Sequence, residues 1–340
     1  MRDISSLTAA LAAFVITFIF GFVFVPYLKK LHFGQSIRDE GPKWHKGKQG
    51  TPTMGGVMMI IGFFASLALT VAIAAMGSGS LNEALGNPYK LTLFLSGAVL
   101  SLGMGAIGFV DDYIKVVKKR NLGLTAMQKT ILQMVVSAAF LASIALCGVD
   151  STYIPFVGYI DIMHGAGLIF WPIALFFVYG FTNAVNLTDG IDGLASSVTL
   201  VVACAFIVYS ALTSGNALNG VSACALAGAC LGFFLWNANP AKVFMGDTGS
   251  LFLGGAVVAL AFGTGCPILL LLFGFVYLCE AMSVVIQVLC YKIFKKRIFK
   301  MSPIHHHFEM CGWSENKIVT VFLIVTAVTS AAAIYIGVNY

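Results

Sequence analysis

Asn183-Ala-Val-Asn186-Leu-Thr-Asp189-Gly-Ile-Asp192-Gly193 interrupts a long apolar segment with two amides and two carboxylates. These four polar residues recur at every third position, so neighbouring members are predicted to share a helix face, and the glycines at 190 and 193 are predicted to end the helix. A carboxylate at the centre of a bilayer costs roughly 2.5 to 3.5 kcal/mol on insertion scales. Two carboxylates together therefore indicate a position at the membrane edge, facing water, a metal ion or a substrate.

The chain has 340 residues, of which 59% are hydrophobic and 10% are charged, against roughly 25% charged residues in an ordinary soluble domain. Its mean hydropathy is +0.92. This composition predicts an all-α integral membrane protein that forms a single polytopic domain over residues 1–340. The eight cysteines fall mostly in apolar segments without a C-x-x-C pair, so they are interpreted as small buried hydrophobic residues.

About ten apolar stretches are long enough to cross a membrane as helices. They lie at about residues 7–25, 53–76, 91–110, 127–147, 168–187, 194–213, 218–236, 249–264, 267–290 and 317–338. The stretch at 249–264 is short and rich in glycine. An even number of spans predicts that both termini lie on the same side of the membrane.

Lysine and arginine gather in three of the loops between these stretches. The first loop holds Lys29, Lys30, Arg38, Lys43, Lys46 and Lys48, the third holds Lys115, Lys118, Lys119 and Arg120, and the ninth holds Lys292, Lys295, Lys296, Arg297 and Lys300. The positive-inside rule makes these loops cytoplasmic and both termini extracytoplasmic. By the same alternation, Asp189, Asp192 and Asp247 are predicted to lie at the cytoplasmic face, where we expect the active site.

Two further carboxylate motifs fall on that same face. Asp111 and Asp112 end the third apolar stretch, and Asp247 lies in a glycine-rich turn before the eighth. A solvated helix end and a plain turn would also explain them, but an aspartate at a helix C-terminus is unfavourable against the helix dipole. Together with Asp189 and Asp192 they predict a divalent cation site, because carboxylate oxygens are the ligands that Mg²⁺ prefers.

Other side chains near this face suit ligand binding. In the loop before the eighth stretch, Phe244 could stack on a base, and Asn237 could bond to polar ligand edges. Lys48 and Lys129 could neutralise phosphate, although either could equally be a lysine whose ammonium group reaches the lipid headgroups.

Three consecutive histidines, His305, His306 and His307, follow the basic segment at 292–300. Consecutive side chains do not converge on one ion in a regular helix, so phosphate contact or support of neighbouring ligands is favoured over a zinc site. Glu280 is a carboxylate well inside an apolar run. Such a residue is functional or paired by default, and a structural hydrogen bond at a helix break is the simplest interpretation.

Four motifs resemble, in the same order, those of the polyprenyl-phosphate N-acetylhexosamine-1-phosphate transferases. They are Asp111-Asp112, Asn186-Leu-Thr-Asp189-Gly-Ile-Asp192-Gly193, Phe244-Met-Gly-Asp247 and Pro303-Ile-His-His-His307-Phe-Glu309. The segments Pro52-Thr-Met-Gly-Gly56 and Ser302-Pro-Ile-His-His-His-Phe-Glu309 are similar to the branch of that family that acts on UDP-N-acetylmuramoyl-pentapeptide. The resemblance covers essentially the whole chain.

The resemblance implies transfer of phospho-N-acetylmuramoyl-pentapeptide from its UDP carrier to undecaprenyl phosphate in a bacterial plasma membrane, with Mg²⁺ required and UMP released. It implies Asp247, Asp111 and Asp112 as catalytic groups and metal ligands, and His305 as a catalytic group in contact with phosphate. The substrate-binding residues that it implies are Lys48, Lys129, Asn186, Asp189, Asp192, Asn237, Phe244, His306 and His307. Membrane lipid and a second copy of the chain are implied partners, and no nucleic acid is expected.

Other functions remain open at this point. A sister enzyme of the same family would use another UDP-amino sugar, although the triple histidine and the 52–56 segment weigh against it. A cation transporter would also carry carboxylates, but transporters place them near the midplane of the membrane on broken helices. A catalytically silent lipid-binding scaffold would not need the carboxylates at all.

Overall fold

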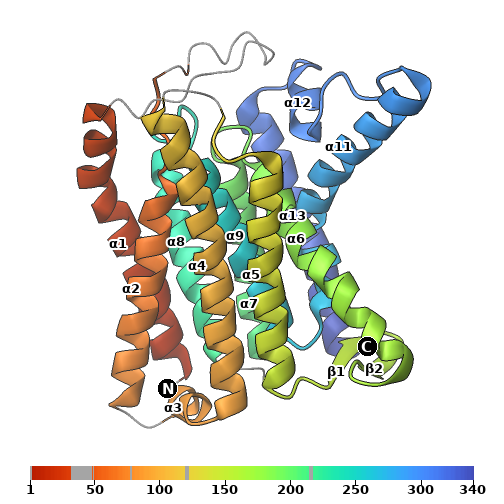
Figure 1. Ribbon diagram of the computed structural model, residues 1–340. Coiled ribbons are helices and arrows are strands. Elements are labelled where there is room, and N and C mark those ends of the chain that lie inside the picture. Colours follow the sequence, from red (N-terminus) through yellow and green to blue (C-terminus); the bar gives the residue numbers. More distant parts are fainter. Residues whose placement is uncertain (1, 32–47, 49, 77–78, 119–121, 214–216) are drawn as a thin grey trace.

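The computed structural model describes residues 2–31, 48, 50–76, 79–118, 122–213 and 217–340, with the side chains of residues 2–4 left out. The chain forms a bundle of helices that run up and down between two ends (Figure 1). The α-helices are α1 Arg2–Lys30, α2 Gly56–Ala75, α3 Ser80–Leu85, α4 Pro88–Val117, α5 Ala126–Leu146, α6 Phe170–Thr188, α7 Leu194–Leu212, α8 Ala217–Asn237, α9 Gly246–Phe262, α10 Leu270–Phe273, α11 Phe275–Phe294, α12 Ile304–Glu309 and α13 Glu315–Asn339.

Most of these helices are membrane spans. Within the described residues, 9 helices are long and apolar enough to cross a membrane, and α9 is a shorter apolar helix of 17 residues. The prediction of a helical, multi-pass membrane protein is therefore confirmed, and the stretch at 249–264 is the short one, as expected. Both ends of the chain lie at the lower end of the bundle in Figure 1.

The ninth predicted span, 267–290, differs from the structure. It is divided into a 3-10 turn at Pro267–Leu269, then α10, then α11, which runs on to Phe294. The break falls at Gly274, where a Cβ would lie 2.9 Å from the Phe181 ring and 3.0 Å from the Leu270 carbonyl oxygen. Beyond it, α11 leans away from the bundle (Figure 1).

A short β-hairpin interrupts the helices, and the sequence did not predict it. Strands β1 Ser151–Ile154 and β2 Gly158–Asp161 pair antiparallel, with Ser151 opposite Asp161 and Ile154 opposite Gly158. The hairpin lies at the same end of the bundle as the two chain ends (Figure 1). The all-α prediction therefore needs this one addition.

Helix α9 lies at the centre of the bundle, packed against α2, α4 and α6, and nearly all of its residues are buried. Glycine lets the backbones touch near its first turn. A Cβ on Gly56 of α2 would lie 2.2 Å from Gly249 Cα, and a Cβ on Gly108 of α4 would lie 2.0 Å from the Asp247 carbonyl oxygen. Such small residues allow membrane helices to approach closely, and here they bring the acidic ends of α4 and α9 together.

The acidic stretch after the fifth span is helical only in part. Helix α6 ends at Thr188, Asp189 is its C-cap with φ −81° and ψ 58°, and Gly193 precedes α7 with φ 76°. The predicted common helix face therefore holds for Asn183 and Asn186 but is wrong for Asp189 and Asp192, which lie beyond the helix. The helix ends two residues before Gly190, because Asp189 already leaves the helical conformation.

The lysines at the ends of α1, α4 and α11 lie at the upper end of the bundle in Figure 1, as do the first turn of α9 and the last turn of α6. The predicted grouping of basic loops and acidic motifs at one end is thus seen for the residues that the structure describes. Five of the basic positions used in that argument lie outside the described residues: Arg38, Lys43, Lys46, Lys119 and Arg120.

Candidate functional site

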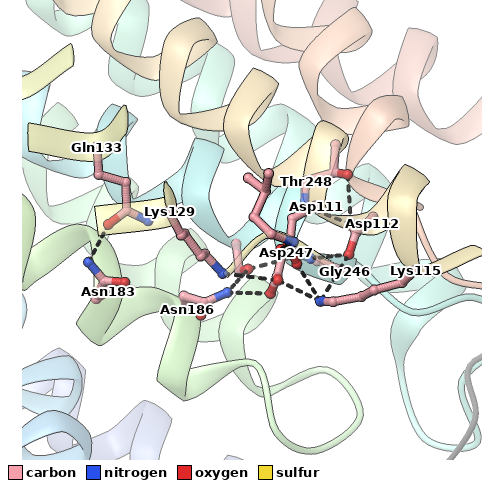
Figure 2. Close-up of polar contacts among 12 residues, drawn as sticks. Asp111, Asp112, Lys115, Lys129, Gln133, Asn183, Asn186, Gly246, Asp247 and Thr248 are labelled. Atoms are coloured by element: carbon pink, nitrogen blue, oxygen red, sulfur yellow. Dashed lines mark hydrogen bonds and ion pairs between the residues drawn. The ribbon is translucent and has the colours of Figure 1, made fainter. Parts of the chain in front are cut away.

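Four helix ends meet at the upper end of the bundle, and each contributes at least one polar side chain to the same place (Figure 2). Helix α5 starts at a capping box in which the Thr125 hydroxyl accepts from Gln128 N–H, so Lys129 falls in the first turn. Helix α9 starts at Gly246, whose φ of +74° favours glycine. Asp247 follows in the first turn, where the helix dipole favours a negative charge.

Asp111, Asp112 and Asp247 form what we call the carboxylate cluster. One oxygen from each of them lies within 4.8 Å of one oxygen from each of the others. Asp111 and Asp112 are each 3% exposed, whereas the Asp247 side chain is 19% exposed. The cluster is thus largely enclosed, with Asp247 as its most open member.

Two lysines neutralise most of the cluster's charge. The Lys115 ammonium lies 2.6 Å from Asp111, 3.7 Å from Asp112 and 2.7 Å from Asp247. The Lys129 ammonium lies 3.0 Å from Asp247. Three carboxylates thus face two ammonium groups, which leaves one formal negative charge. Sequence reasoning missed Lys115, although its spacing of three and four residues from the two aspartates on one helix was the available signal.

The two aspartates of α4 are held in place from other elements. Asp112 accepts from Thr248 N–H at 2.9 Å, from the Thr248 hydroxyl at 2.7 Å and from Asp247 N–H at 3.2 Å. It thereby caps the free N–H groups at the start of α9. Asp111 accepts from Leu124 N–H at 2.8 Å, just before α5. Both carboxylates are therefore oriented before any ligand arrives.

Helix α6 completes the site with its asparagines. Asn186 Nδ2 donates to Asp247 at 2.8 Å and to the Ser250 hydroxyl at 2.7 Å. One turn earlier, Asn183 Nδ2 donates to the Gln133 side-chain oxygen at 2.7 Å, next to Lys129 on α5 (Figure 2). The structure therefore brings together five residues singled out in the sequence: Asp111, Asp112, Asp247, Lys129 and Asn186.

The carboxylate cluster fits a divalent cation. Its donors are hard oxygens from three carboxylates, which suit Mg²⁺, and they lie close enough to share one ion. The ammonium groups of Lys115 and Lys129 already show that this place attracts positive charge. A cation bound by Asp247 would displace these ammonium groups and leave them free to meet an anion.

Asp189 belongs to the same electrostatic environment. Its side chain is partly buried and accepts no hydrogen bond from the residues that the structure describes. Removal from water, followed by repulsion from Asp247, Asp112 and Asp192, raises the pKa of Asp189 to about 8. At neutral pH this carboxyl is therefore mainly protonated, and a cation nearby would favour its ionised form.

Asp192 lies in a second polar group. It accepts from Lys48 at 2.8 Å, from Asn239 at 3.1 Å and from Ala241 N–H at 3.0 Å. The Lys48 ammonium also lies 2.6 Å from Glu315, at the start of α13. Lys48 is thus held between two carboxylates, and Glu315 was not singled out in the sequence.

Asn237 and Phe244 shape the loop that leads to Asp247. Asn237 is 3% exposed and is used internally: it accepts from Gly193 N–H at 3.0 Å and donates to the Val243 carbonyl at 3.0 Å. Phe244 N–H donates to the Pro52 carbonyl at 2.8 Å, and its carbonyl accepts from Gly55 N–H at 2.9 Å. The 52–56 segment is therefore pinned to the loop, while the Phe244 ring remains partly exposed.

The three histidines make three different contacts in and near α12. His305 Nδ1 lies 3.0 Å from Glu280 of α11, and both side chains are 0% exposed. His306 Nδ1 lies 2.6 Å from Glu309, and its side chain is 14% exposed. His307 Nδ1 accepts from Lys300 N–H at 3.1 Å. His305 therefore presents no surface to a ligand in this conformation, whereas His306 does.

Known proteins match this chain over nearly its whole length. The sequence model of glycosyl transferase family 4 matches residues 94–264. A phospho-N-acetylmuramoyl-pentapeptide-transferase of Clostridioides difficile (strain 630) is 44% identical over 331 residues, which cover 96% of this chain and 97% of that protein. A protein of the same name from Bacillus mycoides (strain KBAB4) is 46% identical over 340 residues, which cover 99% of each chain.

Proposed function

Because this chain belongs to glycosyl transferase family 4 and, within it, to the phospho-N-acetylmuramoyl-pentapeptide-transferases, we propose that it makes lipid I. It transfers phospho-N-acetylmuramoyl-pentapeptide from UDP-N-acetylmuramoyl-pentapeptide to undecaprenyl phosphate and releases UMP. This is the first membrane step of peptidoglycan synthesis, and the protein acts in the plasma membrane of a bacterium.

One observation carries the proposal. Three carboxylates and two lysines converge at one end of a membrane bundle, where four helix ends meet. A reaction between two phosphate anions needs such a place, because both anions must be neutralised and aligned. We take this end of the bundle as cytoplasmic, since its loops carry the lysines and the nucleotide substrate is made in the cytoplasm.

The reaction forms one P–O bond and breaks another. An oxygen of undecaprenyl phosphate attacks the phosphorus bonded to the sugar, the bond from that phosphorus to the oxygen of the UMP phosphate breaks, and UMP leaves. A lipid phosphate is already largely ionised at neutral pH, so no residue of the chain is required to remove a proton from it. The work of this site is therefore alignment and charge neutralisation.

Asp247, with Asp111 and Asp112, would hold Mg²⁺. When bound there, Mg²⁺ supplies positive charge that neutralises phosphate oxygens. Asp112 keeps Asp247 in place through its bonds to the first N–H groups of α9, and Asn186 orients the Asp247 carboxylate from α6. Lys115 and Lys129, whose ammonium groups reach Asp247, would donate to phosphate oxygens of the two substrates.

The remaining residues are assigned to the nucleotide side. Asp189 and Asp192 lie on the turn between α6 and α7, and the partly exposed Phe244 ring offers a face on which uracil could stack. His306, whose side chain is 14% exposed, is proposed to meet a phosphate. Asn237 and His305 are both buried. They would hold the backbone of the site in place and would not contact the ligand.

The test is release of UMP by purified protein in detergent. UDP-N-acetylmuramoyl-pentapeptide, undecaprenyl phosphate and Mg²⁺ should all be required, and UDP-N-acetylglucosamine should not replace the first. Chelation with EDTA should stop release, and added Mg²⁺ should restore it. Release from another UDP-amino sugar at an equal or greater rate would assign the chain to a sister activity.

A further inference from the structure

Glu280 has no part in the reaction described above, yet it lies deep in the protein. It is located on α11, and its side chain is 0% exposed. His305 Nδ1 lies 3.0 Å from Glu280 Oε2. When Glu280 is a carboxylate it offers only acceptors, and His305 Nδ1 is then the donor of this hydrogen bond. The pair joins α11 to α12, two elements that are separated in the chain by the basic segment at 295–303.

The other edge of the His305 ring faces the turn between α6 and α7, which carries Asp189 and Asp192. A Cβ placed on Gly190 would lie 2.0 Å from His305 Nε2 and 2.5 Å from its Cε1, so the ring packs directly on the glycine backbone. Among the described residues, neither Nε2 of His305 nor Oε1 of Glu280 has a hydrogen-bond partner, and both atoms are buried. The ring therefore supports the turn by packing, and among the described residues Glu280 holds the ring by a hydrogen bond.

Gly190 separates Asp189 from Ile191 and Asp192, so its position sets where both carboxylates lie. The opposite side of this turn is held by polar contacts: Glu315 accepts from Asp192 N–H at 3.1 Å, and Asn237 accepts from Gly193 N–H at 3.0 Å. The turn is thus clamped between a polar side and the His305 ring. Losing either side would let the turn move.

We infer that Glu280 is a positioning residue for the nucleotide substrate: it fixes the His305 ring, which supports Gly190 and thereby places Asp189 and Asp192. The kinetic part of this inference rests on the proposed function. A positioning role predicts a selective change, because Asp189 and Asp192 are assigned to the nucleotide alone. Lys115 and Lys129, which are assigned to phosphates of both substrates, contact the carboxylate cluster rather than this turn. The Michaelis constant for the nucleotide should change, whereas that for the lipid should not.

Glu280→Leu should raise the KM for UDP-N-acetylmuramoyl-pentapeptide by more than tenfold and leave the KM for undecaprenyl phosphate within twofold. Glu280→Gln should stay within about threefold of the unchanged protein for both constants, because the amide oxygen accepts the same hydrogen from His305. Gly190→Ala should reproduce the Glu280→Leu pattern from the other side of the contact, since its Cβ would displace the ring.

The matched control is Gln287→Ala. Gln287 lies on the same helix, is 9% exposed, and binds the backbone of Ile298 and Phe299 in the segment before α12. It should leave both constants within twofold. If it matches Glu280→Leu, the effect comes from loose docking of the whole segment, and the inference fails. It fails equally if Glu280→Leu lowers kcat alone or raises both constants together.

Hydrogen exchange gives a readout that does not need activity. In folded, monodisperse Glu280→Leu protein, amides of residues 189–194 should exchange at least tenfold faster than in the unchanged protein, with amides 246–250 of α9 unaffected. Unchanged exchange at 189–194 would overturn the inference even if the enzyme is active. Failure of UMP release by the unchanged protein would instead count against the proposed function and leave the exchange result standing.

Discussion

The carboxylate cluster and the Glu280–His305 pair use similar chemical groups in opposite surroundings. In the cluster, the lysine side chains that meet Asp247 are 33% and 20% exposed. A phosphate can therefore reach the lysines, and a cation can reach Asp247. In the pair, both side chains are 0% exposed, and two of their polar atoms have no hydrogen-bond partner among the described residues. A polar contact whose partners can be exchanged suits binding and chemistry, whereas a polar contact that nothing can reach suits only the fixing of a shape.

This comparison ranks the changes that would test it. Altering the open cluster should abolish the reaction while leaving the fold, because its groups are assigned to the ligands. Altering Glu280 or His305, which hold the turn between α6 and α7, should change the affinity for the nucleotide substrate. The following expectations run from the largest effect to the smallest.

Asp247→Asn should lower kcat by about 10³-fold, because the residue joins the other carboxylates to Lys115, Lys129 and Asn186. UMP release over a range of Mg²⁺ concentrations measures it. Glu83→Gln, on the exposed surface of α3 at the other end of the bundle, is the control and should have full activity. A variant that retains more than a tenth of the activity would remove Asp247 from the centre of the site.

Lys115→Met should lower kcat by about 10²-fold and, in contrast to the first variant, should lower the Mg²⁺ concentration needed for half-maximal rate. The reason is that Lys115 competes with a cation for all three carboxylates. Lys118→Met, an exposed lysine at the end of the same helix, should change neither value. A higher Mg²⁺ requirement in Lys115→Met would show that the lysine supports the cation rather than competing with it.

Asp189 should make the metal-free protein less stable at alkaline pH. Its pKa of about 8 in the folded protein lies above its ordinary value of roughly 3.9, so the folded state binds this proton more tightly than the unfolded chain. Stability is therefore lost as pH rises through 8. In EDTA, the Tm of the unchanged protein should fall between pH 6 and pH 9 by about 3 °C more than that of Asp189→Asn.

The same melts locate the source of that pKa. In Asp247→Asn the repulsion that raises the pKa of Asp189 is reduced, so the pH-dependent loss of stability should shift to lower pH. If the melting curves of unchanged protein and Asp189→Asn fall in parallel, Asp189 is not under the influence of the carboxylate cluster. Asp189 would then be grouped with the turn between α6 and α7 and not with the carboxylate cluster.

Glu315→Gln should have the smallest effect, a two- to threefold rise in the KM for the nucleotide. Lys48 loses one charged partner but keeps Asp192 at 2.8 Å. Asp192→Asn should have a larger effect, because Asp192 also accepts from Asn239 and Ala241 N–H. Steady-state rates at saturating lipid measure both variants, and equal effects would show that Glu315 contributes as much as Asp192 to holding the turn.

Much of the fold could be predicted from sequence, because a bilayer demands long apolar helices with internally satisfied backbones. The predicted stretches at 53–76, 127–147 and 194–213 correspond closely to α2, α5 and α7. The break at Gly274 and the hairpin at 151–161 were not predicted, since the first depends on contact with Phe181 and the second on pairing between two strands of only four residues each.

The residue types of the site could also be recognised, because carboxylates at a membrane edge are costly and need a reason. Asp111, Asp112 and Asp247 were singled out, and the structure places them together. The sequence could not separate residues that face a ligand from residues that face the protein. His305 belongs to the same motif as His306, and Asn237 was assigned to ligand binding as Asn186 was, yet His305 and Asn237 are buried and bonded internally.

The sequence by itself determined that this is a multi-pass membrane protein, since hydropathy and charge placement act through local free energies of insertion. It also predicted a cation-binding, phosphate-handling site at one end. Only the tertiary structure decided which polar side chains contact one another. Lys115 lies among three carboxylates, Lys48 lies between Asp192 and Glu315, and Glu280 contacts His305. Lys115–Asp247, Lys48–Asp192 and Glu280–His305 each join residues from different elements or loops. Their geometry follows from how closely glycine lets the helices pack, which no local pattern records.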